Sequence, residues 1–168
     1  MRRMVGRYVM NFMMLQALIP AEWQAFVKYG FSGTVLDGEI GVPYKIPMLD
    51  SETRIDELKR AVAQFASDRE WEPFHSLKNL SMSIAIEASE LMERFQWLEN
   101  SESDKGIDNS DERTAIEEEL ADVFIYLLQF ANRADIDLAS ATQRKLELNA
   151  EKYPVEKSRG RSDKYDTL

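Results

Sequence analysis

Hydrophobic residues after position 50 recur every three or four positions, which is the spacing that places side chains on one face of an α-helix. The pattern predicts four helices, over about residues 52–69, 77–98, 113–133 and 137–152. The polar stretch between the second and third helices is predicted to be a loop, with Ser110 or Asp111 capping the third helix. Four helices with a short connection between the third and fourth predict an all-α fold, a four-helix bundle.

The first 47 residues follow a different pattern. Arginines precede an apolar run over residues 8–19, and glycines and prolines punctuate the stretch that follows. The run is well short of the ~20 residues that a transmembrane helix needs. Its acid-free start permits a cleaved targeting sequence, but polar residues interrupt the run and no small-residue cleavage site follows it. We predict an irregular N-terminal extension of unknown role over 1–47, one domain over 48–168, and a cytoplasmic location.

Composition narrows the chemistry that the chain can perform. The 168 residues include no cysteine and one histidine, which excludes disulfides, thiolate zinc sites and a cysteine nucleophile. The formal net charge is −9, and all of the acidic excess lies after residue 50. This charge disfavours binding to a nucleic acid polymer or to an anionic membrane. Carboxylates are therefore the main candidates for chemistry.

Four carboxylates fall on or beside the apolar arcs of two predicted helices. Glu87 and Glu90 belong to the second helix, and Glu119 and Asp122 border the arc of the third, which includes Leu120 and Leu127. Residues three apart are neighbours on a helix, so each pair projects in nearly one direction. If the two faces oppose each other, four acids converge, and two charges 4 Å apart repel by about 4 kcal/mol at an effective dielectric near 20.

Such a cluster needs a cation, protonation or basic partners. Oxygen-only ligands favour Mg²⁺ or Mn²⁺ over zinc. The alternative is that these acids are border residues of amphipathic helices, paired with nearby lysines and arginines. A ferritin-like di-iron site needs repeated Glu-x-x-His motifs, which a chain whose one histidine is His75 does not contain. A Walker loop is also missing from the sequence, so phosphate chemistry would have to run through a metal.

Four motifs occur in an order that resembles a known family. They are W-x-x-F-H-x-x-K-N-L at 71–80, E-x-x-E-L-x-E-x-F-Q-W at 87–97, E-E-L-x-D-V-x-I-Y-L at 118–127 and K-x-x-x-N-x-x-K-Y-P at 145–154. Together they resemble the MazG-type all-α nucleoside triphosphate pyrophosphohydrolases, and within them the dCTP pyrophosphatase branch. The resemblance covers about residues 52–166.

This resemblance implies hydrolysis of a nucleoside triphosphate, dCTP or a related pyrimidine nucleotide, to the monophosphate and pyrophosphate. It implies Mg²⁺ as cofactor, with Mn²⁺ as a substitute, held by Glu87, Glu90, Glu119 and Asp122. A bound metal ion lowers the pKa of a water for in-line attack, and Glu90 or Glu119 is expected to accept the proton of that water.

The resemblance also implies a set of residues that contact the nucleotide: His75, Trp97, Tyr126, Lys145, Asn149 and Tyr153. Further basic candidates are Lys78, Arg94, Arg159 and Lys164. Relatives of this type assemble, so a homotetramer is expected, with a dimer as the second choice. Two alternatives stay open: a non-catalytic helical metal-binding or interaction module, and a relative that acts on another nucleotide such as dUTP or phosphoribosyl-ATP.

Overall fold

The computed structural model describes residues 48–165. The predicted extension over 1–47, including its targeting alternative, lies outside the described residues. In the described part, no helix has both the length and the apolar character needed to cross a membrane.

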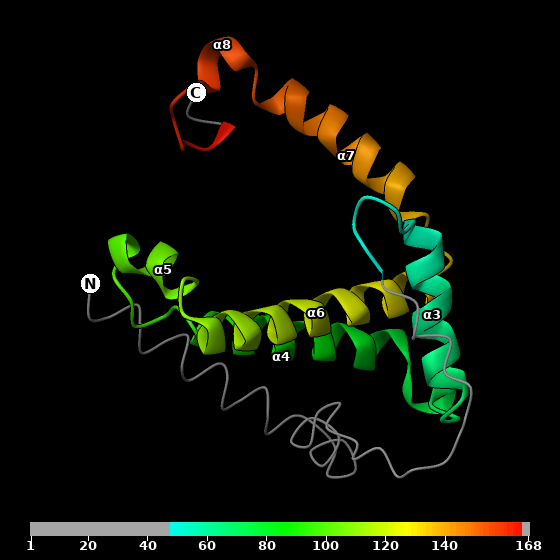
Figure 1. Ribbon diagram of the computed structural model, residues 1–168. Helices are drawn as coiled ribbons and strands as arrows, with labels where there is room; N and C mark the ends of the chain where they lie inside the picture. Colours follow the sequence, from blue (N-terminus) through cyan, green and yellow to red (C-terminus); the bar gives the residue numbers. More distant parts are fainter. Residues whose placement is uncertain (1–47, 166–168) are drawn as a thin grey trace.

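Two long helices form the centre of the fold. Helix α4 (Leu77–Glu93) lies alongside α6 (Ser110–Arg133) in the opposite direction, and α3 (Ile55–Ser67) packs against α6 (Figure 1). The buried side chains of these helices are Ala66, Leu80, Ser83, Ile86, Ile116, Tyr126, Leu128, Gln129 and Ala131. The all-α prediction is confirmed.

The chain before α4 is fixed by a network of short-range hydrogen bonds. Ser76 caps α4 by accepting a hydrogen bond from the backbone N–H of Asn79, at 3.2 Å. The side-chain amide of Asn79 donates to the carbonyl of Phe74, at 2.9 Å, and so ties the short helix η2 (Glu72–Phe74) to the start of α4. His75 lies between these two elements and is consequently held at one end of the α4–α6 pair.

Two boundaries in the connection between α4 and α6 differ from the sequence prediction. Helix α4 ends at Glu93, and the stretch predicted to be a loop contains a short helix, α5 (Asn100–Gly106), so the loop prediction is wrong. Asn109 caps α6: its side-chain oxygen accepts from the backbone N–H groups of Asp111 and Glu112, at 2.9 and 3.3 Å. The prediction of Ser110 or Asp111 as the cap is therefore also wrong.

The last long helix, α7 (Leu138–Lys152), starts where the sequence predicts. Asp137 caps it by accepting from the backbone N–H of Ser140, at 2.7 Å. The helix contains no buried residue and extends away from the α4–α6 pair toward α8 (Val155–Ser158) (Figure 1). Within one chain, the packed helices of the predicted bundle are thus α3, α4 and α6.

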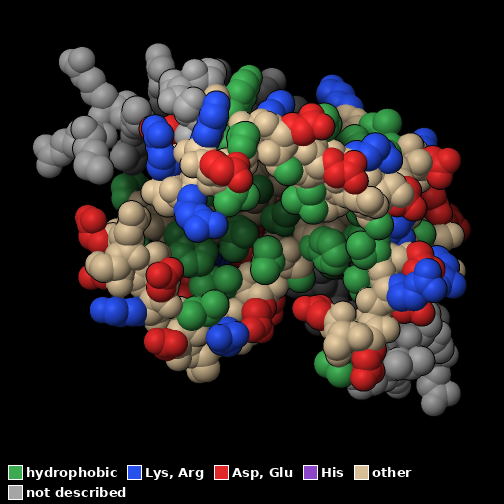
Figure 2. All heavy atoms as spheres, turned by 90° about the horizontal axis from the view of Figure 1, so that it is seen from above, with side chains coloured by type: hydrophobic (Ala, Val, Ile, Leu, Met, Phe, Trp, Pro, Cys, Tyr) green, Lys and Arg blue, Asp and Glu red, His purple; other side chains and the backbone are tan. Residues whose placement is uncertain are grey.

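Hydrophobic side chains remain exposed on both α6 and α7. On α6, Leu120 is 56% exposed, and Phe124 and Leu127 are also exposed, whereas the sequence pattern assigned Leu120 and Leu127 to the apolar arc. The buried face of α6 instead includes polar residues such as Gln129. Figure 2 shows hydrophobic side chains filling the hollowed middle of the molecule, with charged side chains around them.

Candidate metal and nucleotide site

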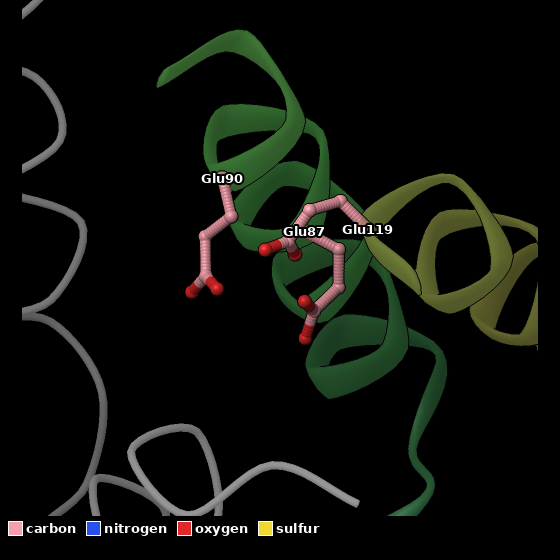
Figure 3. A group of neighbouring side chains, drawn as sticks. All are labelled: Glu87, Glu90 and Glu119. Carbon is pink, nitrogen blue, oxygen red and sulfur yellow. The ribbon is translucent and has the colours of Figure 1, made fainter. Parts of the chain in front are cut away.

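Three of the four predicted metal ligands lie together between α4 and α6. Carboxylate oxygens of Glu87, Glu90 and Glu119 lie within 4.8 Å of one another, and all three residues are half-buried. Figure 3 shows Glu119 reaching from α6 toward Glu87, with Glu90 on the next turn of α4. The register of the two antiparallel helices therefore brings the two acidic pairs together, and this cluster could hold a metal ion.

The electrostatics of the cluster favour a bound cation or protons. Burial raises the pKa of Glu87 to about 8, and the neighbouring carboxylates, first Glu90, then Asp122 and Glu119, contribute to the rise. Burial and then Glu119 also raise the pKa of Glu90. Because each ionised carboxylate opposes the ionisation of its neighbours, the cluster is destabilised when all of its members are charged without a cation.

Asp122 lies close to the three glutamates but outside the tightest group. Burial raises its pKa, followed by the charges of Glu119 and Glu118. One turn further along α6, burial raises the pKa of Tyr126, and the charges of Glu87 and Asp122 add to this effect. Asp122 and Tyr126 thus share the electrostatic environment of the cluster.

A basic side chain reaches the cluster from the end of α4. Arg94 forms an ion pair with Glu119, at 3.6 Å, and a longer one with Glu112, at 3.9 Å. This ion pair neutralises part of the negative charge of the cluster, as expected from the alternative in which the acids pair with nearby lysines and arginines. Arg94 forms its ion pair with Glu119, and the pKa of Glu87 stays strongly raised in the presence of this arginine.

His75 lies at the other end of the α4–α6 pair and is buried, with 7% exposure. Its Nδ1 atom is 3.1 Å from the side-chain nitrogen of Gln129 on α6. Both residues line a cavity of ≈ 600 Å³ together with Arg60, Glu72 and Arg133. A cavity of this size is typical of small-molecule sites.

The remaining predicted substrate residues lie outside the two helices that carry the acidic cluster. Trp97 follows α4 and is 70% exposed. Lys145 and Asn149 lie on α7, which extends away from the cluster (Figure 1). Tyr153 follows α7 and packs edge to face against Tyr165, with ring centroids 6.1 Å apart.

Sequence reasoning missed Gln129 as a candidate site residue. It lies three residues after Tyr126 and seven after Asp122, so these three side chains share one face of α6. That spacing was the available signal. Its partner His75 is 54 residues away in sequence, and their hydrogen bond becomes visible only in the folded chain.

An all-α fold with carboxylates converging from two antiparallel helices defines a class of helical protein able to hold a divalent cation through oxygen ligands. The chain belongs to the MazG-like family, whose model matches residues 82–168. The resemblance predicted from the motifs is confirmed.

Individual relatives agree with this assignment. The chain is 40% identical to dCTP pyrophosphatase 1 of Rattus norvegicus over 117 residues, which cover 70% of this chain and 69% of that protein. It is 38% identical to dCTP pyrophosphatase 1 of Homo sapiens over 117 residues, with the same coverage of 70% and 69%. The crystal structure of a pyrophosphatase from Archaeoglobus fulgidus is 37% identical, with a TM-score of 0.57, and the match covers 64% of this chain and 99% of that one. The prediction of an enzyme of the nucleoside triphosphate pyrophosphohydrolase class is confirmed.

Proposed function

We propose that this enzyme hydrolyses dCTP or a related pyrimidine nucleoside triphosphate between its α- and β-phosphates, and that it acts in control of the nucleotide pool. The products are the nucleoside monophosphate and pyrophosphate. The observation that carries the proposal is the convergence of Glu87, Glu90 and Glu119 in a chain of the MazG-like family. The name of its relatives, dCTP pyrophosphatase 1, supports the choice of nucleotide.

The donor set of the acidic cluster fits a hard divalent cation. Its side chains offer oxygen atoms alone and are half-buried, and burial, followed by the charges of the neighbouring carboxylates, raises the pKa of Glu87. We assign Mg²⁺ to this site, with Mn²⁺ as a substitute, held by Glu87, Glu90, Glu119 and Asp122. When bound, the ion supplies neutralisation of the polyphosphate and a lowered pKa for a coordinated water.

Side chains of the protein orient the nucleotide and accept the proton of the attacking water. Glu90 or Glu119 takes the proton of the attacking water. Burial raises the pKa of Glu90, which brings this carboxylate closer to the pKa suited to a general base. His75, Trp97, Tyr126, Lys145, Asn149 and Tyr153 contact the nucleotide.

We further propose that the domain over residues 48–168 works as a homotetramer, with a dimer as the second choice, and that residues 1–47 are an extension of this domain. The exposed hydrophobic residues of α6, Leu120, Phe124 and Leu127, support assembly because a second copy can bury them. Assembly also offers a second α7 whose Lys145 and Asn149 can approach the acidic cluster.

A panel of nucleoside triphosphates tests the proposed reaction. Each nucleotide is incubated with the full chain and Mg²⁺, and the monophosphate, pyrophosphate and orthophosphate released are measured. We expect equal amounts of monophosphate and pyrophosphate, with dCTP or a close pyrimidine analogue as the best substrate. Release of orthophosphate, or no turnover of any nucleotide, would contradict the proposal, and faster turnover of dUTP or phosphoribosyl-ATP would replace the proposed substrate.

A further inference from the structure

His75 and Gln129 form a hydrogen-bonded pair that the proposed reaction leaves partly unexplained. The two side chains are 7% and 8% exposed, and the amide nitrogen of Gln129 lies 3.1 Å from Nδ1 of His75. An amide nitrogen donates and does not accept, so Nδ1 accepts and the ring proton of a neutral histidine lies on Nε2. The bond thus selects one tautomer of the ring.

The surroundings of His75 keep its ring neutral. Burial lowers the pKa of His75, the charge of Arg133 acts in the same direction, and the nearby Glu72 opposes both. Arg60 lies on the wall of the same cavity, as do Glu72 and Arg133. A neutral ring with Nδ1 occupied presents a single N–H donor at Nε2.

Two buried polar atoms of the pair have no hydrogen-bond partner within the described residues. They are Nε2 of His75 and the side-chain oxygen, Oε1, of Gln129. Buried polar atoms almost always have partners, because leaving them unpaired is unfavourable. One is a donor and the other is an acceptor, and both residues line the ≈ 600 Å³ cavity.

The position of the pair suits one end of a nucleotide. Asp122, Tyr126 and Gln129 share one face of α6, and the rise of a helix places Gln129 about 10 Å beyond Asp122. This separation is of the size of a nucleotide measured from its phosphates to its base. A nucleobase edge presents adjacent acceptors and donors, which complement an adjacent donor and acceptor on the protein.

We propose that Gln129 is a specificity-determining residue, which fixes His75 as an Nε2–H donor and supplies its own Oε1 as the adjacent acceptor for a nucleobase edge. The proposal rests on the proposed function, because it assigns the base-recognising part of the same nucleotide site.

The first test is spectroscopic and does not require turnover. His75 is the one histidine of the chain, so ¹⁵N labelling of histidine gives a single pair of ring signals. In the full-length protein we expect Nε2 protonated and Nδ1 unprotonated at neutral pH. In Gln129→Glu the carboxylate accepts a hydrogen bond from Nδ1–H and so favours the ring with its proton on Nδ1, which shifts the Nδ1 signal toward the protonated position. A wild-type ring protonated on Nδ1 alone would overturn the proposal, whether or not the variant folds.

The second test measures binding of dCMP and dTMP, without added metal, to the wild type and to Gln129→Leu. We expect the variant to bind the preferred monophosphate about tenfold more weakly, which is the loss typical of one hydrogen bond. We also expect it to discriminate less between the two bases. The matched control is Gln143→Leu, because Gln143 lies outside this cavity and pairs with Glu147, at 3.1 Å, and the control should bind both nucleotides as the wild type does.

Equal binding by Gln129→Leu and Gln143→Leu would overturn the role of Gln129, even if the wild type hydrolyses dCTP. Conversely, the expected loss of binding in a protein that turns over no nucleotide would support base recognition and contradict the proposed reaction. The steady-state constants provide a further distinction: we expect Gln129→Leu to raise KM about tenfold while kcat changes less than about twofold.

Discussion

The α4–α6 pair and helix α7 both carry candidate site residues, but the pair brings its residues together and α7 buries none of its own. Between α4 and α6, three carboxylates gather within 4.8 Å and are half-buried. Helix α7 contains no buried residue, and its Lys145 is exposed. Two antiparallel helices in one chain are thus enough to assemble the acidic cluster, whereas α7 does not bring its cation and amide to that cluster.

This difference separates two tasks in the proposed reaction. The metal binding that we propose uses Glu87, Glu90 and Glu119, which a single chain brings together. Contact between α7 and a phosphate-bearing substrate requires a helix from elsewhere, and a second copy of the chain is the source that we propose. The two groups of residues should therefore respond differently to substitution and to mixing of variants.

The largest expected effect comes from Glu87→Gln. The substitution removes a charge that the cluster needs for a divalent cation but that is unfavourable without one, since the pKa of Glu87 is raised to about 8. We expect turnover with Mg²⁺ to fall by at least about 10³-fold, while the metal-free variant unfolds at an equal or higher temperature than the wild type.

The control for this experiment is Glu93→Gln, on the same helix. Glu93 is exposed and lies outside the group of three carboxylates. We expect its activity and its response to Mg²⁺ to match the wild type. If Glu87→Gln instead destabilises the metal-free protein, and the wild type gains no stability from Mg²⁺, Glu87 is a structural residue and the metal site is wrong.

The next effect concerns α7. We expect Lys145→Ala to raise KM for the nucleotide about 10- to 100-fold, because a charge-assisted contact to phosphate is lost. Its affinity for Mg²⁺ alone should stay at the wild-type value, since the acidic cluster is intact. Arg144→Ala, which removes the neighbouring cation, serves as the control and should leave KM unchanged.

Mixing inactive variants tests where that α7 comes from. A chain with Glu87→Gln supplies an intact α7, and a chain with Lys145→Ala and Asn149→Ala supplies an intact acidic cluster. If sites combine two copies, subunit exchange in an equal mixture should restore about a quarter of the wild-type sites. Activity that stays at the sum of the separate variants would show that each α7 serves its own chain.

The sequence predicted the acidic cluster better than its surroundings. The spacing of Glu87 and Glu90, and of Glu119 and Asp122, already paired the side chains, because three residues nearly complete a helical turn. The convergence of the pairs depended on the register of α4 against α6, which a helical wheel does not contain. Helix α5 was missed because its segment is polar and short, without hydrophobic periodicity.

The burial of α6 was harder to predict for a similar reason. Leu120 and Leu127 fit the apolar arc, but α4 and α3 pack against the face that includes Tyr126 and Gln129. The hydrogen bond from Gln129 to His75 stabilises a polar residue in that face. Local periodicity therefore located the helices, while contacts between distant segments decided which side of α6 is buried.

A smaller effect is expected in the pH dependence of stability. The pKa of Glu87 is about 8 in the folded chain and near 4.5 when unfolded, so the folded state binds the extra proton between these values. As far as this group is concerned, the stability of the metal-free protein should be highest below about pH 4.5 and should fall as the pH rises to 8. The full difference between the two pKa values corresponds to about 4 kcal/mol at pH 8, and solvent screening of the half-buried side chain reduces the expected loss to about 2 kcal/mol. Urea unfolding at several pH values measures this slope, and Glu87→Gln should flatten it. A slope unchanged in the variant would contradict the raised pKa.

The smallest effect concerns Arg94, whose positive charge lies beside the acidic cluster. Its guanidinium is 3.6 Å from a carboxylate oxygen of Glu119, and a metal ion that binds Glu119 has to compete with it. Because a half-exposed ion pair contributes at most about 1 kcal/mol, Arg94→Met should tighten Mg²⁺ binding by about two- to fivefold. Titration calorimetry with Mg²⁺ alone measures the change, and Arg113→Met is the control, since Arg113 pairs with Glu117, at 3.2 Å, on the exposed side of α6. Weaker binding in Arg94→Met than in the control would show that Arg94 orients Glu119 for the ion rather than competing with it.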